Sequence, residues 1–293
     1  MKKNTKSILL LVTLLLYLLL CLINSNLVIN NILDYSILFL KRLFPVSFIF
    51  FILSKLLIDY GLLDIIYKYL HINSSKLYIF IISMISGFPS GAKYTKDLLE
   101  SNYISIKEAN QIIKYSHFPN PLFILGSVNL LLNNQLLSFK ILLSIIISNF
   151  IIFITNCHSN NYFPNNSNSS SFSTNLSTAI INSFNTMLNI YGTSLFFYLI
   201  SSLIIQYFSF NNYLYILISG LFDLTKGVFS TIIINNILTR AYFILIFTSF
   251  GSLSIHMQVN SLITNTNIKY SNFLLGRIIS TILSLLIFSI LVI

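Results

Sequence analysis

The sequence predicts an all-α fold: a polytopic helical membrane protein with about eight or nine spans and an internal, inverted repeat of broken or re-entrant helices. Hydrophobic residues make up 55% of the chain and charged residues only 8%, against roughly 25% charged in a soluble domain, so the surface is too apolar to face water. The apolar residues form unbroken blocks, which favours helices over the alternating strands of a barrel. Several blocks are too short to cross a membrane and are interrupted by Gly or Pro, which is typical of repeat-built transporters.

Composition and motifs exclude other classes. The net charge of +10 comes from 17 Lys and Arg residues that are scattered singly between apolar blocks, as topology determinants are, and they form no basic stripe for nucleic acid. No CxxC pair, metal-ligand spacing, GxSxG, HExxH or Walker sequence occurs. We therefore expect no enzyme, metal or cofactor. The expected partners are a small-molecule substrate and the lipid bilayer, and the sequence leaves a homo-oligomer open.

Four segments are expected along the chain. Residues 1–26 form an N-terminal transmembrane helix, because lysines precede an apolar run that is too long for a signal peptide and has no cleavage site after it. Residues 27–157 form the first gate-like repeat. Residues 158–175 are an Asn/Ser-rich linker with too little apolar surface to order itself. Residues 176–293 form the second repeat.

The two repeats match at two pairs of breaks. Residues 85–88 (Ile-Ser-Gly-Phe) correspond to residues 218–221 (Ile-Ser-Gly-Leu), and each stretch leads to a lysine. About thirty residues further on, residues 117–122 correspond to residues 250–253. Such paired interruptions mark the binding site of an inverted-repeat transporter.

The first break contains the residues of an anion site. Pro89 cannot continue the preceding helix, so a new helix is expected to start at Pro89 or Ser90. Its free amides and dipole would attract an anion, and Lys93, one turn further on, would add a positive charge. The alternative is a tight surface loop with Lys93 in water. The candidate residues are Ser86, Gly87, Phe88, Pro89, Ser90, Gly91 and Lys93.

The matching break in the second half contains Asp223, Thr225 and Lys226 between two apolar blocks. Asp223 and Lys226 are three residues apart and can pair on one helix face. Ionisable residues at membrane depth mark a substrate or ion path, so we expect Asp223, with Thr225, to bind a coupling ion or carry a proton. The alternative is an interfacial loop with two solvated charges.

The second pair of breaks contains side chains that suit a polar solute. Asn120 and Pro121 lie in the first half, and Ser254, His256 and Gln258 lie in the second. The last three alternate with apolar residues, which predicts an extended or loosely wound segment. His256 is also a candidate for proton transfer, although a buried histidine is more often a hydrogen-bonded structural residue.

These motifs resemble the YlbJ-type sporulation integral membrane proteins, which carry the gate domain shared with nucleoside transporters. The similarity extends from about residue 28 to the end and lies in residues 44–45, 52–54, 86–93, 108–110, 120–126, 223–227 and 250–259. Two features depart from the family pattern: His117, Phe118 and Pro119 replace small polar residues, and Asp223 replaces a glutamate.

The resemblance implies a secondary-type transporter that moves dipicolinic acid, a small aromatic dicarboxylate, during endospore formation. It would act in the outer forespore membrane or the mother-cell membrane. A planar dianion requires hydroxyls, helix N-termini and cations, which Ser86, Ser90, Lys93 and Lys226 could supply, and an apolar slot, which Phe88 could supply.

Two alternatives stay open. A cation-coupled nucleoside permease is one of them, since Asn120, Gln258 and Phe88 would also suit a nucleoside. A non-transporting membrane scaffold for spore envelope assembly is the other.

Overall fold

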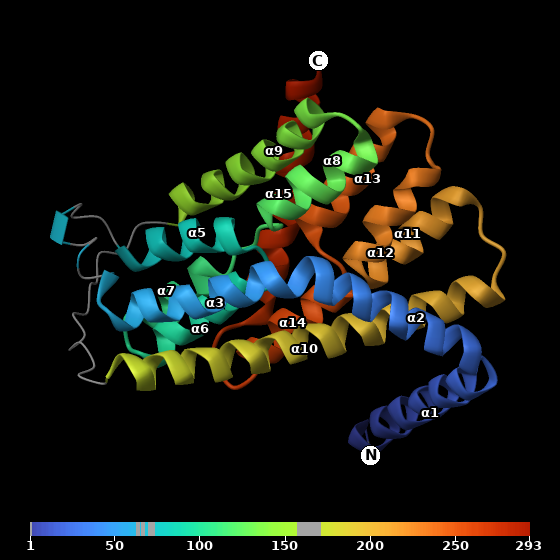
Figure 1. The fold of residues 1–293 in the computed structure, drawn as a ribbon, viewed down its shortest axis with the longest axis horizontal. Coiled ribbons are helices and arrows are strands. Elements are labelled where there is room, and N and C mark those ends of the chain that lie inside the picture. Colours follow the sequence, from blue (N-terminus) through green and yellow to red (C-terminus); the bar gives the residue numbers. More distant parts are fainter. Residues whose placement is uncertain (1, 63–64, 66–67, 70–73, 157–170) are drawn as a thin grey trace.

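The computed structural model describes residues 2–62, 65, 68–69, 74–156 and 171–293, and every regular element in these ranges is helical (Figure 1). The all-α prediction is thus confirmed for the described chain. The helices are α1 (Lys2–Ile23), α2 (Ser25–Leu38), α3 (Phe44–Asp59), α5 (Ser74–Ser86), α6 (Ser90–Glu100), α7 (Ile106–Ile112), α8 (Asn129–Leu132), α9 (Gln135–Thr155), α10 (Phe172–Tyr207), α11 (Asn212–Phe222), α12 (Leu224–Ser230), α13 (Ile237–Phe250), α14 (Leu253–Ile263) and α15 (Tyr270–Val292). Single π-helical turns at Phe39–Leu43 and Phe123–Val128 precede α3 and α8, and a 3-10 turn at Thr231–Ile233 follows α12.

Four helical stretches of the described chain are long and apolar enough to cross a membrane. They are α9, α10, the joined α13–α14 segment and α15. The predicted N-terminal span bends by 94° between α1 and α2, and this pair adds a fifth span if it crosses as one unit. The other apolar blocks fold as shorter helices, so the described residues provide fewer full-length spans than the sequence suggested.

A long rod made of α2 and α3 runs antiparallel to α10, the longest helix of the described chain (Figure 1). Near one end Ser202 donates a hydrogen bond to Asn31, and at the other end the rings of Tyr60 and Phe172 lie 6.3 Å apart. These two helical layers form one wall of the site described below.

Two pairs of short helices meet at breaks inside the protein. The first pair is α5–α6 and the second is α11–α12 (Figure 1). Each pair contains a glycine at which the helix lies so close to other backbone that a larger residue would not fit. A Cβ on Gly91 would overlap the carbonyl oxygen of Ser116, and a Cβ on Gly227 would overlap the backbone of Gly220. These glycines therefore let the broken helices approach neighbouring backbone closely.

Helix α15 connects the second break of the first half, at residues 117–122, to the second break of the second half, at residues 250–253. Its Arg277 side chain is fully buried, and the guanidinium donates to the carbonyl oxygens of Lys114, His117 and Ser249 and to Asn149 Oδ1 at 2.8–3.3 Å. The first two carbonyls belong to the unwound segment before Asn120, and the third lies at the end of α13. One cation thus satisfies buried carbonyl groups from both halves of the chain.

Two expectations from the sequence differ from the structure: the conformation of residues 254–258 and the end of the 158–175 linker. Residues 254–258 are not extended but lie within helix α14. Helix α10 begins at Phe172, inside the predicted 158–175 linker, and residues 158–170 lie outside the described residues.

Candidate solute-binding site

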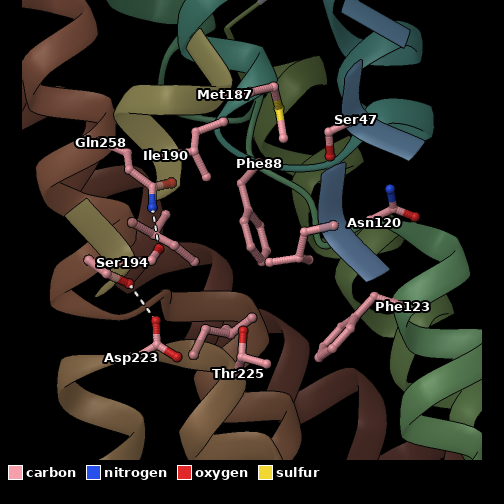
Figure 2. A pocket seen from close by; sticks show the side chains of 14 residues that line it. Ser47, Phe88, Asn120, Phe123, Met187, Ile190, Ser194, Asp223, Thr225 and Gln258 are labelled. Atoms are coloured by element: carbon pink, nitrogen blue, oxygen red, sulfur yellow. Dashed lines mark hydrogen bonds between the residues drawn. The ribbon is translucent and has the colours of Figure 1, made fainter. Parts of the chain in front are cut away.

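A cavity lies where the four breaks meet α3 and α10 (Figure 2). Both halves of the chain contribute to it. Its lining combines seven apolar side chains with seven that carry an amide, hydroxyl or carboxylate group, and such a combination of apolar and polar groups suits a small-molecule site. It is lined by Leu43, Ser47, Phe88, Asn120, Phe123, Met187, Ile190, Ser194, Asp223, Leu224, Thr225, Ser254, Ile255 and Gln258.

The two breaks of the first half form one unit beside the cavity. Gly87 has a φ of +78°, and a Cβ at this position would lie 2.7 Å from the backbone nitrogen of Asn120. The Asn120 amide donates to the Ser86 carbonyl oxygen at 3.4 Å, and its Oδ1 accepts from the Leu122 amide at 2.8 Å. Phe88, between Gly87 and α6, extends into the middle of the cavity (Figure 2). The short Asn120 side chain therefore holds the first break against the start of the next helical segment.

His117 supports the Phe88 side chain from behind. The two rings are stacked with centroids 5.0 Å apart, and His117 is almost completely buried. His117 stands where the resembled family has a small polar residue, and in this chain it packs as an aromatic surface that positions Phe88.

Asp223 is the acidic group of the second half. It is 1% exposed and lies at the N-cap of α12, where Oδ1 accepts from the Lys226 backbone amide at 3.0 Å. Its Oδ2 accepts from the Ser254 hydroxyl at 3.3 Å (Figure 2). The Ser254 hydroxyl in turn lies 2.7 Å from the Ser252 hydroxyl. Thr225 lines the cavity next to it. The carboxylate thus joins the first break of the second half to its second break.

Helix α14 turns only some of its predicted residues toward the cavity. Ser254 and Gln258 are four residues apart, so they share one helix face, and both line the cavity. Gln258 donates to the Ser194 hydroxyl of α10 at 2.8 Å (Figure 2).

His256 points away from this face. Its Nε2 lies 3.2 Å from the Phe250 carbonyl oxygen, which can only accept, so in the neutral ring Nε2 carries the proton and Nδ1 accepts from the Tyr270 hydroxyl at 2.7 Å. In this arrangement His256 fastens α14 to α13 and α15.

Lys93 does not line the cavity. Its ammonium lies 3.6 Å from Asp97 and 5.3 Å from the ring centre of Phe51 in α3. It faces a separate polar pocket between α6, α10 and α14. This second pocket also carries Lys96 and Glu100.

Lys226 is likewise turned outward. Its ammonium donates to Ser202 at 2.6 Å and lies 4.8 Å from the ring centre of Tyr198, both in α10. The side chain therefore turns to α10 instead of forming the predicted pair with Asp223, which caps α12 through the Lys226 backbone. Each predicted cation thus lies over an aromatic ring of the α3–α10 wall.

The remaining residues of the first break form hydrogen bonds with one another. The Ser86 hydroxyl lies 2.7 Å from that of Ser90, which also bonds to the Gly87 carbonyl oxygen. Pro89 is the N-cap of α6, as the sequence predicted, but the Ser90 amide already donates to Gly87 at 3.1 Å. Pro121 is half-buried and, like these groups and Gly91, is not part of the cavity lining.

Sequence reasoning missed several residues of the site. Ser47 of α3 and Ser194 of α10 line the cavity but carry no signal beyond being small polar residues within apolar helices. Arg277 did carry a signal, because a lone cation within an apolar span is costly and marks a functional or structural requirement.

The cavity has a simple charge pattern. Among the described lining side chains Asp223 is the only charged one, and the others offer neutral amides, hydroxyls and aromatic surface. A buried carboxylate is stable only when a proton, a cation or hydrogen bonds offset its charge. The site can therefore receive a cation or proton together with a polar, ring-bearing solute.

Comparison with known proteins gives one relevant match. The chain is 36% identical over 93 residues to the sporulation integral membrane protein YlbJ of Bacillus subtilis (strain 168), a match that covers 29% of this chain and 23% of that protein. It spans less than a quarter of that relative's length. No family model and no solved structure matches the chain. The chain is a helical, multi-pass integral membrane protein with a relative among sporulation membrane proteins.

Proposed function

We propose that the protein is a secondary-type membrane transporter that acts in endospore formation and binds its solute in the cavity of Figure 2. The observation that carries this proposal is the convergence of four helix breaks, two from each half, on one cavity. Irregular backbone at membrane depth is tolerated where it is buried in protein or lines a water-filled cavity. Transporters use such breaks to bind solutes between repeats.

An inverted repeat with gate-like halves is part of this proposal. The α2–α3 rod and α10, its proposed counterpart, run antiparallel, as counterparts related by a two-fold axis in the membrane plane would. Lys93 and Lys226 follow the matching breaks and lie over aromatic rings of these two walls. Ser148 of α9 and Ser280 of α15 come within 3.1 Å of each other, which suits equivalent helices that meet near such an axis.

Dipicolinate is the first substrate candidate, because the relative is a sporulation membrane protein and Phe88 and Phe123 provide aromatic surface for a planar ring. Its two negative charges would be repelled by an ionised Asp223. Asp223 therefore has to carry a coupling cation or proton, with Thr225 as a further oxygen ligand. This need for charge compensation couples solute entry to cation entry.

A nucleoside is the second candidate. The amides of Asn120 and Gln258 are neutral hydrogen-bonding groups on opposite sides of the cavity (Figure 2). No described cationic side chain lines this cavity, and a neutral solute would need none. A scaffold without transport activity would use none of these groups.

Reconstituted protein tests the assignment. We expect uptake of labelled dipicolinate into vesicles, stimulated by a proton or sodium gradient, and no stimulation in the Asp223→Asn variant. Uptake of uridine without dipicolinate uptake would establish the permease instead. Uptake of neither solute under any gradient would refute the transporter. During sporulation a tagged protein is expected in the outer forespore or mother-cell membrane.

A further inference from the structure

A second cavity adjoins the first one. It shares four lining residues with the inner cavity: Leu43, Ser47, Asn120 and Phe123. On its other side it reaches Lys41, in the π-helical turn before α3, and the turn that contains Gly126 and Ser127. Because the two cavities share walls, a solute in the outer cavity lies directly before the inner one.

The two cavities carry opposite charges. Lys41 is the only charged side chain among the described residues that line the outer cavity, and Asp223 is the only one in the inner cavity. The ion pairs of the described chain involve Lys55, Lys93 and Lys96, so no described carboxylate lies within 4.0 Å of the Lys41 ammonium. The path thus begins at an available cation and ends at a carboxylate.

We propose that the outer cavity is an anion subsite in which Lys41 receives the carboxylate of an aromatic acid before the ring passes Phe123 into the inner cavity. The proposal rests on the function proposed above and names the group that selects its substrate class. Lys93 faces the separate α6–α10–α14 pocket beside Asp97, and Lys226 is bound to Ser202. Lys41 is therefore the cation that the path itself presents.

The junction between the cavities suits this order of contacts. Asn120 and Phe123 belong to both linings, so a planar acid can rest its ring on Phe123 while its carboxylate stays at Lys41. An ammonium attracts anions over several ångströms and selects for charge more than for shape. A neutral nucleoside would gain nothing from Lys41.

An anionic lipid offers the same chemistry. Lys41 is exposed and lies at the end of the bent α1–α2 segment that is apolar enough for a span, so a lipid phosphate would meet its ammonium as a solute carboxylate does. The experiment therefore separates the two sources by lipid composition.

The test uses the full chain in phosphatidylcholine vesicles, with dipicolinate, picolinate and uridine as solutes. In the Lys41→Gln variant we expect the KM for both acids to rise about tenfold, the loss of one hydrogen bond to a charged group, with uridine unchanged. Lys41→Arg should retain the wild-type KM. Lys140→Gln, which removes a single lysine of α9 outside both cavities, is the matched control and should also leave KM unchanged. Raising the salt concentration should shrink the difference, because a surface charge is screened.

Several results would overturn the inference. They are an unchanged KM for the acids in Lys41→Gln, an equal rise for uridine, and an effect that appears only when phosphatidylglycerol is added. Calorimetric binding of dipicolinate in detergent separates this inference from the proposed function. Binding that depends on Lys41 without any uptake would remove only the transport assignment. Gradient-driven uptake that ignores Lys41 would remove only the subsite.

Discussion

Gly87 is the point at which a minimal change should disturb the site most. It adopts a φ of +78°, and a Cβ there would lie 2.7–2.8 Å from three atoms of Asn120, two of them backbone atoms. Gly87→Ala therefore combines an unfavourable backbone conformation with an overlap that a side-chain rotation cannot relieve. Because real Cβ atoms essentially never come this close to another atom, the Asn120 backbone would have to shift, and Asn120 lines both cavities.

Two further glycines separate these contributions. Gly251 has a φ of +88°, but the nearest atom to its Cβ position is 3.5 Å away, so Gly251→Ala adds backbone strain alone. Gly192 lies in α10 with no atom within 4 Å, so Gly192→Ala adds neither. Backbone strain of this kind costs about 1–3 kcal/mol, and overpacking adds about 1–3 kcal/mol. We expect a loss of about 2–6 kcal/mol for Gly87→Ala and of about 1–3 kcal/mol for Gly251→Ala.

Thermal unfolding of the detergent-purified variants, followed by size-exclusion chromatography after heating, measures these effects. A loss of this size should lower the Tm of Gly87→Ala by at least about 3 °C, whereas Gly192→Ala should match or exceed the wild type because alanine is the better helix former. Gly87→Ala should also raise the KM for solute, through the shift of Asn120. The reasoning fails if Gly87→Ala unfolds at the temperature of Gly192→Ala.

Three other variants test separate parts of the site. Asp223→Asn keeps the acceptor for the Lys226 amide but removes the charge, so gradient-stimulated uptake should disappear. The Tm should stay within a few degrees of the wild type, as expected for a change of at most about 1 kcal/mol. Stimulated uptake in this variant would contradict the coupling role of Asp223. Arg277→Lys keeps the charge, but the lysine cannot donate to all four acceptors of the guanidinium. Each buried acceptor left without a donor costs about 1–3 kcal/mol, so the Tm should fall. An unchanged Tm would count against the structural role of Arg277. His256→Gln should lower Tm by the loss of about one hydrogen bond, roughly 1 kcal/mol, and leave gradient stimulation intact; loss of stimulation would move the coupling role to His256.

The features that follow from composition and chain breaks were predictable from the sequence. A chain with 8% charged residues and unbroken apolar blocks can satisfy its backbone in lipid only as helices or a closed barrel, and the described chain is helical. Pro89 lacks the amide that a continuing helix would use, and it caps the new helix α6. Gly251 likewise marks the end of α13.

The orientation of side chains was less predictable. Ser254, His256 and Gln258 alternate with apolar residues, yet their outer two members are also four residues apart, and this spacing places them on one face of a helix. The polar–apolar alternation over these five residues was too short to distinguish an extended segment from a helix. For the lysines, sequence spacing fixes a position on their own helix but not which neighbour that face meets. The ammonium groups of Lys93 and Lys226 lie over aromatic rings of α3 and α10, respectively. Tertiary packing alone decides which neighbouring helix a side chain contacts.

The position of Arg277 has a consequence for how the protein is made. The Lys114 carbonyl and the Asn149 Oδ1 lie in the first half, whereas the guanidinium that donates to them arrives with α15. During synthesis the first half must therefore wait in the membrane with part of its polar backbone unfinished. A chain that ends before α15 would leave these two acceptors without the donor that they have in the finished protein, so the last helix completes the hydrogen bonding of the first half.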